Sequence, residues 1–111
     1  MGETALSLNE LSVVELCAGL AAKKFSAVEL AEALTRYIQQ NSSLGSIATF
    51  DPETYHKQAE ASDVRRKAGS SKSLDGIPLI LKDNIDTKDL PTTGGTGALA
   101  GQKPSKDALA V

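Results

Sequence analysis

The sequence has few of the residues on which disulfides, metal sites and aromatic clusters depend. Cys17 is the only cysteine and His56 the only histidine. A single cysteine excludes an intrachain disulfide, and a structural zinc site needs several such ligands, so we expect no structural metal. Aromatic residues make up 4% of the 111 residues and tryptophan is absent. A hydrophobic core therefore has to come from Leu, Ile, Val and Ala.

The chain also lacks long apolar runs and a strong charge of either sign. No run approaches the length of a membrane span, and residues 1–11 have neither a basic start nor an apolar stretch, so we expect no membrane contact and no secretory signal. Together with the unpaired cysteine, this predicts a cytoplasmic protein. The 14 acidic and 12 basic residues leave a net charge of −2, which gives no electrostatic reason to expect direct binding to nucleic acid.

Two serine–glutamate pairs predict where helices begin. Residues 12–15 and 26–29 each have Ser followed by Glu three positions later, which is the pattern of a capping box. Apolar residues then recur at helical spacing, so we expect helices over residues 12–22 and 27–40.

A third helix is expected from Asp51-Pro52 to about residue 67, with Asp as the N-cap and Pro at the first helical position. Tyr37 falls on the apolar stripe of the second helix and is expected in the core. On the third helix a weaker apolar side is marked by Tyr55, Ala59 and Val64.

Two short apolar segments predict strands. Residues 47–50 are a short candidate, and residues 77–81 form an apolar run that we interpret as a buried strand. Strands mixed with amphipathic helices favour an α/β fold. We expect one domain segment over residues 1–111, with a helical opening at about 7–68 and a lysine-bearing strand and loop at about 74–111. The glycine- and proline-rich tail has little periodicity, which favours a functional loop or an incomplete fold.

Lys82 is the residue whose position suggests chemistry. A lysine at the end of a buried strand has to be paired, reach solvent or lose its proton, and a deprotonated lysine can act as a general base. The plain alternative is a strand-end lysine that reaches solvent. We interpret Asp83 and Asp86 as turn residues, with Asp83 able to orient Lys82 by a hydrogen bond. Gly94-Gly95 is better read as a turn than as a phosphate cradle, and His56 as a solvated helix residue.

Three segments in and around this region resemble the amidase signature family. They are residues 74–78 (LDGIP), 81–87 (LKDNIDT) and 91–96 (PTTGGT). Residues 11–16 and 25–30 look like the two opening helices of that family, and residues 104–108 like the start of its next helix. The resemblance covers nearly the whole chain and is most specific at residues 76–87.

The resemblance implies a mixed-sheet α/β domain and hydrolysis of a carboxylic amide to acid and ammonia, without metal or cofactor. In the family, the lysine at the position of Lys82 is the base of a Ser–cis-Ser–Lys triad. It deprotonates a serine that activates a second, nucleophilic serine, and backbone N–H groups of a glycine-rich loop form the oxyanion hole. Only Lys82 carries over to this sequence as a catalytic residue.

The sequence departs from the family because no glycine- and serine-rich stretch follows the lysine. Ser42-Ser43 and Ser70-Ser71 have no such context. We therefore expect an N-terminal piece of the domain, inactive alone, whose exposed sheet edge favours self-association or a partner chain. Three interpretations stay open: an amidase for small aryl-acetamides, the A subunit of a glutamyl-tRNA amidotransferase, and a non-catalytic remnant or binding module.

Overall fold

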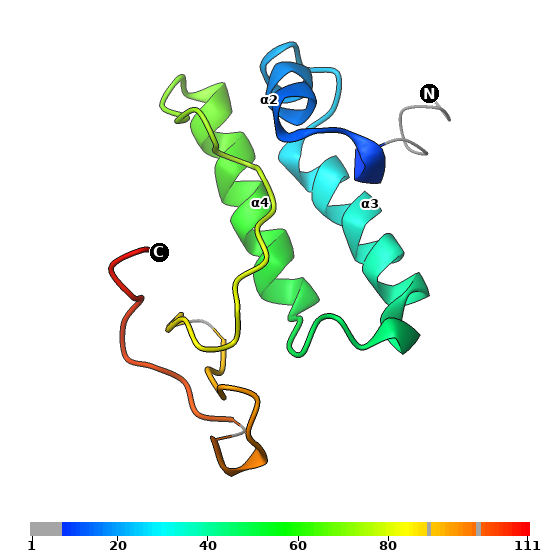
Figure 1. The fold of residues 1–111 in the computed structure, drawn as a ribbon. Coiled ribbons are helices and arrows are strands. Elements are labelled where there is room, and N and C mark those ends of the chain that lie inside the picture. The colour runs from blue at the N-terminus through cyan, green and yellow to red at the C-terminus, as the bar shows by residue number, and fades with distance from the viewer. Residues whose placement is uncertain (1–7, 89, 100) are drawn as a thin grey trace. The chain divides into compact units, whose positions relative to one another are not determined.

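The computed structural model describes residues 8–88, 90–99 and 101–111. Residues 1–7, where we expected no secretory signal, lie outside that range. The α-helices are α2 (Val13–Ala21), α3 (Ala27–Gln40) and α4 (Pro52–Lys67), and the short 3₁₀ helices are η1 (Leu8–Glu10), η2 (Ser42–Leu44) and η3 (Gly97–Leu99) (Figure 1). The chain divides into two compact units, one of residues 8–44 and 52–78 and the other of Gly45–Asp51 and Leu79–Val111. We call them the helical unit and the loop unit.

Both predicted capping boxes are present. Ser12 Oγ accepts a hydrogen bond from the Glu15 N–H at 3.1 Å, and Glu15 Oε1 accepts one from the Ser12 N–H at 2.9 Å. The same reciprocal pair joins Ser26 and Glu29 at 3.0 and 2.9 Å. These side chains satisfy backbone donors that a helix start leaves without partners, which explains why the predicted starts of α2 and α3 are confirmed.

The N-terminus of α3 has a further cap that comes from α4. The Asp63 carboxylate accepts hydrogen bonds from the N–H groups of Ala27 at 2.8 Å and Val28 at 3.0 Å. With the Ser26–Glu29 box, each of the four N–H groups at this helix start has an acceptor. A negative charge at a helix N-terminus is also favoured by the helix dipole. Asp63 thus joins the C-terminal half of α4 to the beginning of α3.

The core of the helical unit lies where α2, α3 and α4 meet. Helices α3 and α4 run antiparallel and side by side (Figure 1). Leu20 and Leu30 are almost fully buried, and Ala59 and Ser62 form the buried face of α4. Small residues on α4 let the two helix backbones approach closely. The other buried apolar residues are Leu8, Leu16, Phe25, Ala27 and Ala31.

Two residues predicted to face the core do not do so. Tyr37 is 48% exposed and Val64 is 67% exposed, because α4 meets α3 through a narrow face that covers neither side chain. Tyr55, which was predicted on the same side of α4 as Val64, does pack against the core. Its burial raises the pKa of the phenol to about 12.

The segment that follows α4 is fastened to that helix at Asp75 and Gly76. The Arg65 guanidinium donates two hydrogen bonds of 2.7 Å to the Asp75 carboxylate, and Arg66 donates one of 2.7 Å to the Asp75 carbonyl. The bidentate contact with Arg65 holds the pKa of Asp75 well below its usual range. Gly76 has φ +89°, and a Cβ there would lie 3.0 Å from Ser62 Oγ. Only glycine suits both the conformation and the space.

The two predicted strands are not formed in the part of the chain that the structure describes. Residues 47–50 and 77–81 have no strand assignment, and Leu79 and Ile80 are 76% and 75% exposed. A strand is stabilised by hydrogen bonds to a neighbouring strand, and the described residues offer these segments none. One isolated antiparallel bridge joins Thr87 and Leu90. The helices are therefore confirmed, while the strands required by an α/β fold are not.

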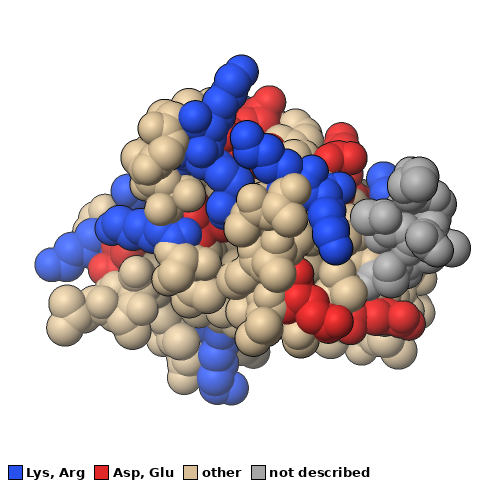
Figure 2. All heavy atoms as spheres, turned by 90° about the horizontal axis from the view of Figure 1, so that it is seen from above, with Lys and Arg blue, Asp and Glu red and all other residues tan. Residues whose placement is uncertain are grey.

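The face of the molecule shown in Figure 2 carries charges of both signs. Figure 2 shows basic and acidic side chains interspersed on the face that it displays, in keeping with the net charge of −2. Among the helices formed by the described residues, none is both long and apolar enough to cross a membrane.

Candidate functional site

Lys82 lies in the loop unit at the start of a tight turn. Its carbonyl accepts a hydrogen bond from the Ile85 N–H at 3.0 Å, which closes the turn through Asp83 and Asn84. The Lys82 side chain is exposed. The turn residues Asp and Asn explain why the chain reverses here. The prediction that Lys82 ends a buried strand is wrong, because the preceding segment is neither paired nor buried.

Asp83 links this turn to the glycine-rich loop. Its Oδ1 accepts a hydrogen bond from the Thr93 N–H at 2.9 Å, and its Oδ2 accepts one from the Thr93 hydroxyl. The Asp83 carbonyl accepts a third from the Gly94 N–H at 2.8 Å. The bonds from the Thr93 hydroxyl and then from its N–H lower the pKa of Asp83. We interpreted Asp83 as a turn residue able to orient Lys82 by a hydrogen bond, and its carboxylate is instead bound by Thr93.

The glycine-rich loop makes a turn beside Asp83, as the residue types predict. Gly94 and Gly95 have φ +60° and +81°, a conformation that side chains with a Cβ rarely adopt. The Thr96 N–H donates to the Thr93 carbonyl at 3.0 Å, and the Thr92 N–H donates to the Gln102 carbonyl at 2.9 Å. The loop therefore has defined hydrogen bonding, although its described residues form no regular element longer than the single-turn helix η3.

The C-terminal residues of the loop unit fold back on the turn. The Ala108 N–H donates to the Asp86 carbonyl at 2.8 Å, and Asp107 Oδ1 accepts from the Lys88 N–H at 2.9 Å. Asp86 thus contributes a backbone acceptor to this contact, while the turn itself is formed by Asp83 and Asn84. Residues 104–108, which look like the start of a helix, are not helical.

Together these contacts form what we call the lysine site, made of Lys82, Asp83 and residues 93–95. Residues 81–87 and 91–96, which the resemblance singled out separately, are joined here through Asp83 and Thr93. Chemically the site presents a primary amine on a backbone that hydrogen bonds hold in place. In its deprotonated form an amine can accept a proton from a neighbouring hydroxyl, and such a base acts in acyl transfer only with a nucleophile beside it.

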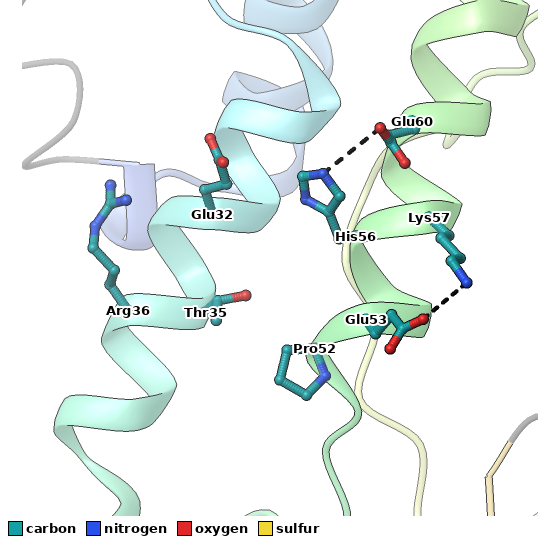
Figure 3. A pocket seen from close by; sticks show the side chains of 8 residues that line it. All are labelled: Glu32, Thr35, Arg36, Pro52, Glu53, His56, Lys57 and Glu60. Atoms are coloured by element: carbon teal, nitrogen blue, oxygen red, sulfur yellow. Dashed lines mark hydrogen bonds and ion pairs between the residues drawn. The ribbon is translucent and has the colours of Figure 1, made fainter.

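The other candidate residues form no comparable site. His56 lines a shallow groove of about 510 Å³ between α3 and α4, and its Nε2 lies 3.7 Å from Glu60 Oε2 (Figure 3). The ring is partly solvated, as predicted. Half-buried Cys17 contacts the Ser73 carbonyl at 3.5 Å. Within the described ranges no three His, Cys, Asp or Glu residues cluster as metal ligands.

The remaining residues that line the groove come from both helices and carry charges of both signs. Glu32, Thr35 and Arg36 lie on α3, and Pro52, Glu53 and Lys57 on α4 (Figure 3). Lys57 Nζ and Glu53 Oε1 form an ion pair at 2.9 Å. Mixed charge of this kind favours no particular ligand.

Sequence reasoning missed the partners of two carboxylates. Thr93 stands ten positions after Asp83, and nothing in their spacing indicates the contact. Asp63 was also missed as a cap. One signal could have found it: Asp63 follows the core-facing residues Ala59 and Ser62 on the same side of α4. A carboxylate on a buried helix face needs donors, and a neighbouring helix start supplies them.

Comparison with known proteins agrees with the resemblance. The family model described as Amidase matches residues 29–111, a range that includes the whole lysine site. A relative from Anaeromyxobacter sp., named as the A subunit of glutamyl-tRNA(Gln) amidotransferase, is 38% identical, and the match covers 100% of this chain and 23% of the relative. Proteins of the same name match from Methylorubrum extorquens (38% identical, 88% of this chain, 20% of the relative) and Acinetobacter baumannii (41%, 83%, 19%).

The chain spans about a fifth of the length of these curated relatives. The family match covers well over half of the chain, and it includes the turn of Lys82 and the glycine-rich loop bound to it. The chain therefore belongs to the amidase signature family.

Proposed function

We propose that this chain supplies the lysine base of an amide hydrolase, and that Lys82 is that base. The observation that carries the proposal is the lysine site itself: an exposed lysine starts a turn that Asp83 binds to a glycine-rich loop. Both segments are the ones that resemble the family's lysine motif and the loop after it. A general base has to be accessible to the proton that it removes, and the Lys82 side chain meets this requirement.

The proposed reaction is acyl transfer through serine. The lysine accepts a proton from one serine, which activates a second serine to attack the amide carbonyl. Ammonia leaves, an acyl-enzyme forms, and water then releases the carboxylic acid. In this proposal the two serines and the oxyanion hole belong to polypeptide that completes the domain, because no segment of this sequence matches them.

The same proposal gives the exposed apolar segment at residues 77–81 a role. In a completed domain it would be a strand of a mixed sheet, and residues 1–111 would be the opening segment of a single α/β domain. Leu79 and Ile80 are more than two-thirds exposed here, and burial of both would contribute about 3–5 kcal/mol to association with the completing part.

Of the two enzyme candidates, the A subunit of an amidotransferase is the better supported. The relatives described above carry that name, whereas an aryl-acetamide hydrolase rests on the resemblance of the chain's opening alone. Such a protein would use glutamine as the amide and would work in the cytoplasm together with a partner subunit. Direct contact with nucleic acid by this segment is not part of the proposal, given its net charge of −2.

A chimera tests the proposal. This chain would replace the matching segment of the Anaeromyxobacter relative, expressed with that enzyme's partner subunits, and ammonia release would be measured from glutamine, indoleacetamide and mandelamide. We expect release from glutamine that falls by at least about 1,000-fold in Lys82→Met, since the nucleophile loses its base. Lys103→Met, which removes an exposed lysine from the same unit, serves as the matched control and should leave the rate unchanged.

The outcomes separate the catalytic interpretations from the non-catalytic one. A folded chimera that retains its rate in Lys82→Met contradicts the assignment of the base. A folded chimera without any release supports the non-catalytic alternative. The 111-residue chain alone should release no ammonia above background, because a base without its nucleophile cannot perform acyl transfer.

A further inference from the structure

We propose that Thr93 is a positioning residue for Lys82 and acts through Asp83. The inference rests on the proposed function, in which Lys82 is the base. Thr93 does not touch Lys82. It fixes the residue that follows the lysine in the chain, and with it the backbone from which the lysine side chain extends.

The geometry shows a two-sided grip on Asp83. Thr93 donates to both carboxylate oxygens, through its N–H at 2.9 Å and through its hydroxyl. The Gly94 N–H donates to the Asp83 carbonyl at 2.8 Å. Side chain and main chain of Asp83 are thus held by two successive residues, so the residue can neither rotate nor slide along the loop without breaking several bonds at once.

The Thr93 hydroxyl has a second contact that extends the grip. It donates to the Asp83 carboxylate and accepts from the Gly95 N–H at 3.2 Å. A hydroxyl can donate once and accept at the same time, so this arrangement uses both capacities. The carboxylate polarises the hydroxyl and strengthens the second bond. Thr93 therefore couples the lysine turn to the positive-φ Gly95.

The turn on the other side is closed as well. The Lys82 carbonyl accepts from the Ile85 N–H at 3.0 Å. The carbonyls of Lys82 and Asp83 both have partners, so each of the two successive peptide groups that follow Lys82 and Asp83 is held by a hydrogen bond. A lysine side chain has four rotatable bonds and is otherwise poorly ordered. A fixed backbone reduces the number of positions that the lysine amine samples before proton transfer. Misplacement of a catalytic group by about 1 Å can lower the rate by about 100-fold.

Position 93 offers a matched set of substitutions. Thr93→Val keeps the shape and the N–H donor but removes the hydroxyl. Thr93→Ser keeps the hydroxyl. Thr49→Val makes the same chemical change at an exposed position of the same unit and serves as the control. Each variant would be made in the 111-residue chain and in the chimera described above.

Amide hydrogen exchange in the 111-residue chain tests the grip without any activity. We expect Thr93→Val to accelerate exchange at Gly95, which loses its acceptor, and at Gly94 by about 10-fold or more. Thr93→Ser should restore slow exchange, and Thr49→Val should not change it. Unchanged exchange at both glycines in Thr93→Val would overturn the structural part of the inference.

Kinetics of the chimera test the positioning. We expect Thr93→Val to lower kcat by about 10- to 100-fold with KM within about twofold, and Thr93→Ser to remain within about threefold of the parent. A merely structural loss would lower the amount of folded protein and with it the apparent kcat at unchanged KM, so kcat is calculated per mole of folded chimera, quantified by circular dichroism. A kcat unchanged in Thr93→Val, while Lys82→Met abolishes release, overturns this inference and leaves the proposed function standing. Activity that survives Lys82→Met defeats the proposed function instead.

Discussion

The cap that Asp63 places on α3 leads to a sharp stability prediction. The carboxylate accepts from the N–H groups of Ala27 at 2.8 Å and Val28 at 3.0 Å. A hydrogen bond to a charged group contributes about 1.5–3 kcal/mol, and a helix cap about 0.5–2 kcal/mol. Because the carboxylate is only partly buried, water compensates some of the loss. Ala27 is 1% exposed, so its N–H is poorly placed to find a water molecule.

We expect Asp63→Ala to lower the free energy of unfolding by about 2–3 kcal/mol. For a unit of this size that corresponds to a fall in the melting temperature of about 10 °C or more, and to a urea midpoint lower by about 2 M. Asp63→Asn keeps one acceptor oxygen and should lose about half as much. Circular dichroism at 222 nm, followed during thermal and urea denaturation, measures both variants.

Glu60→Ala is the matched control for the lost charge. It removes a carboxylate from the same helix, where the contact with His56 is 3.7 Å long and exposed. Such a pair contributes less than about 0.5 kcal/mol. If Asp63→Ala is no more destabilising than Glu60→Ala, the cap does not hold α3 to α4 and the reasoning from its hydrogen bonds is refuted.

Two further predictions concern the segment after α4. Gly76→Ala should lower the free energy of unfolding, measured by urea denaturation, by about 2–3 kcal/mol, because the new Cβ would combine φ +89° with a contact of 3.0 Å to Ser62 Oγ. Gly69 has φ +78° but lies in open space, so Gly69→Ala should lower it by about 1 kcal/mol. Equal losses in the two variants would contradict the steric argument. Arg65 holds the pKa of Asp75 below its unfolded value of about 4. The stability that this ion pair contributes is present above about pH 4 and is lost as the pH falls toward the lowered folded pKa. Asp75→Asn should therefore flatten the acid side of a stability–pH curve measured by urea denaturation. An unaltered slope would argue against this contact.

The helices could be predicted because their signals are local. The capping boxes at Ser12 and Ser26 involve residues three apart, and the same residues form them in the structure. The exposure of Tyr37 and Val64 could not be predicted from local signals. An apolar stripe indicates which residues share a helix face, but not how much of that face a neighbouring helix covers. The strand at residues 77–81 failed for a related reason: its hydrophobicity is local, while its hydrogen-bond partners have to come from another segment.

The candidate site was likewise predictable from the sequence only in part. Motif and residue type were enough to single out Lys82, to predict turns at Asp83 and Gly94, and to identify the family to which the chain belongs. The tertiary structure alone decided that Asp83 binds Thr93, because a ten-residue loop has to close before the two side chains meet. It also decided that Asp63 caps a helix 35 and 36 positions earlier in the chain. Short-range hydrogen bonds and hydrophobic periodicity are encoded residue by residue, whereas a contact across a loop or between helices depends on where the whole chain places its backbone.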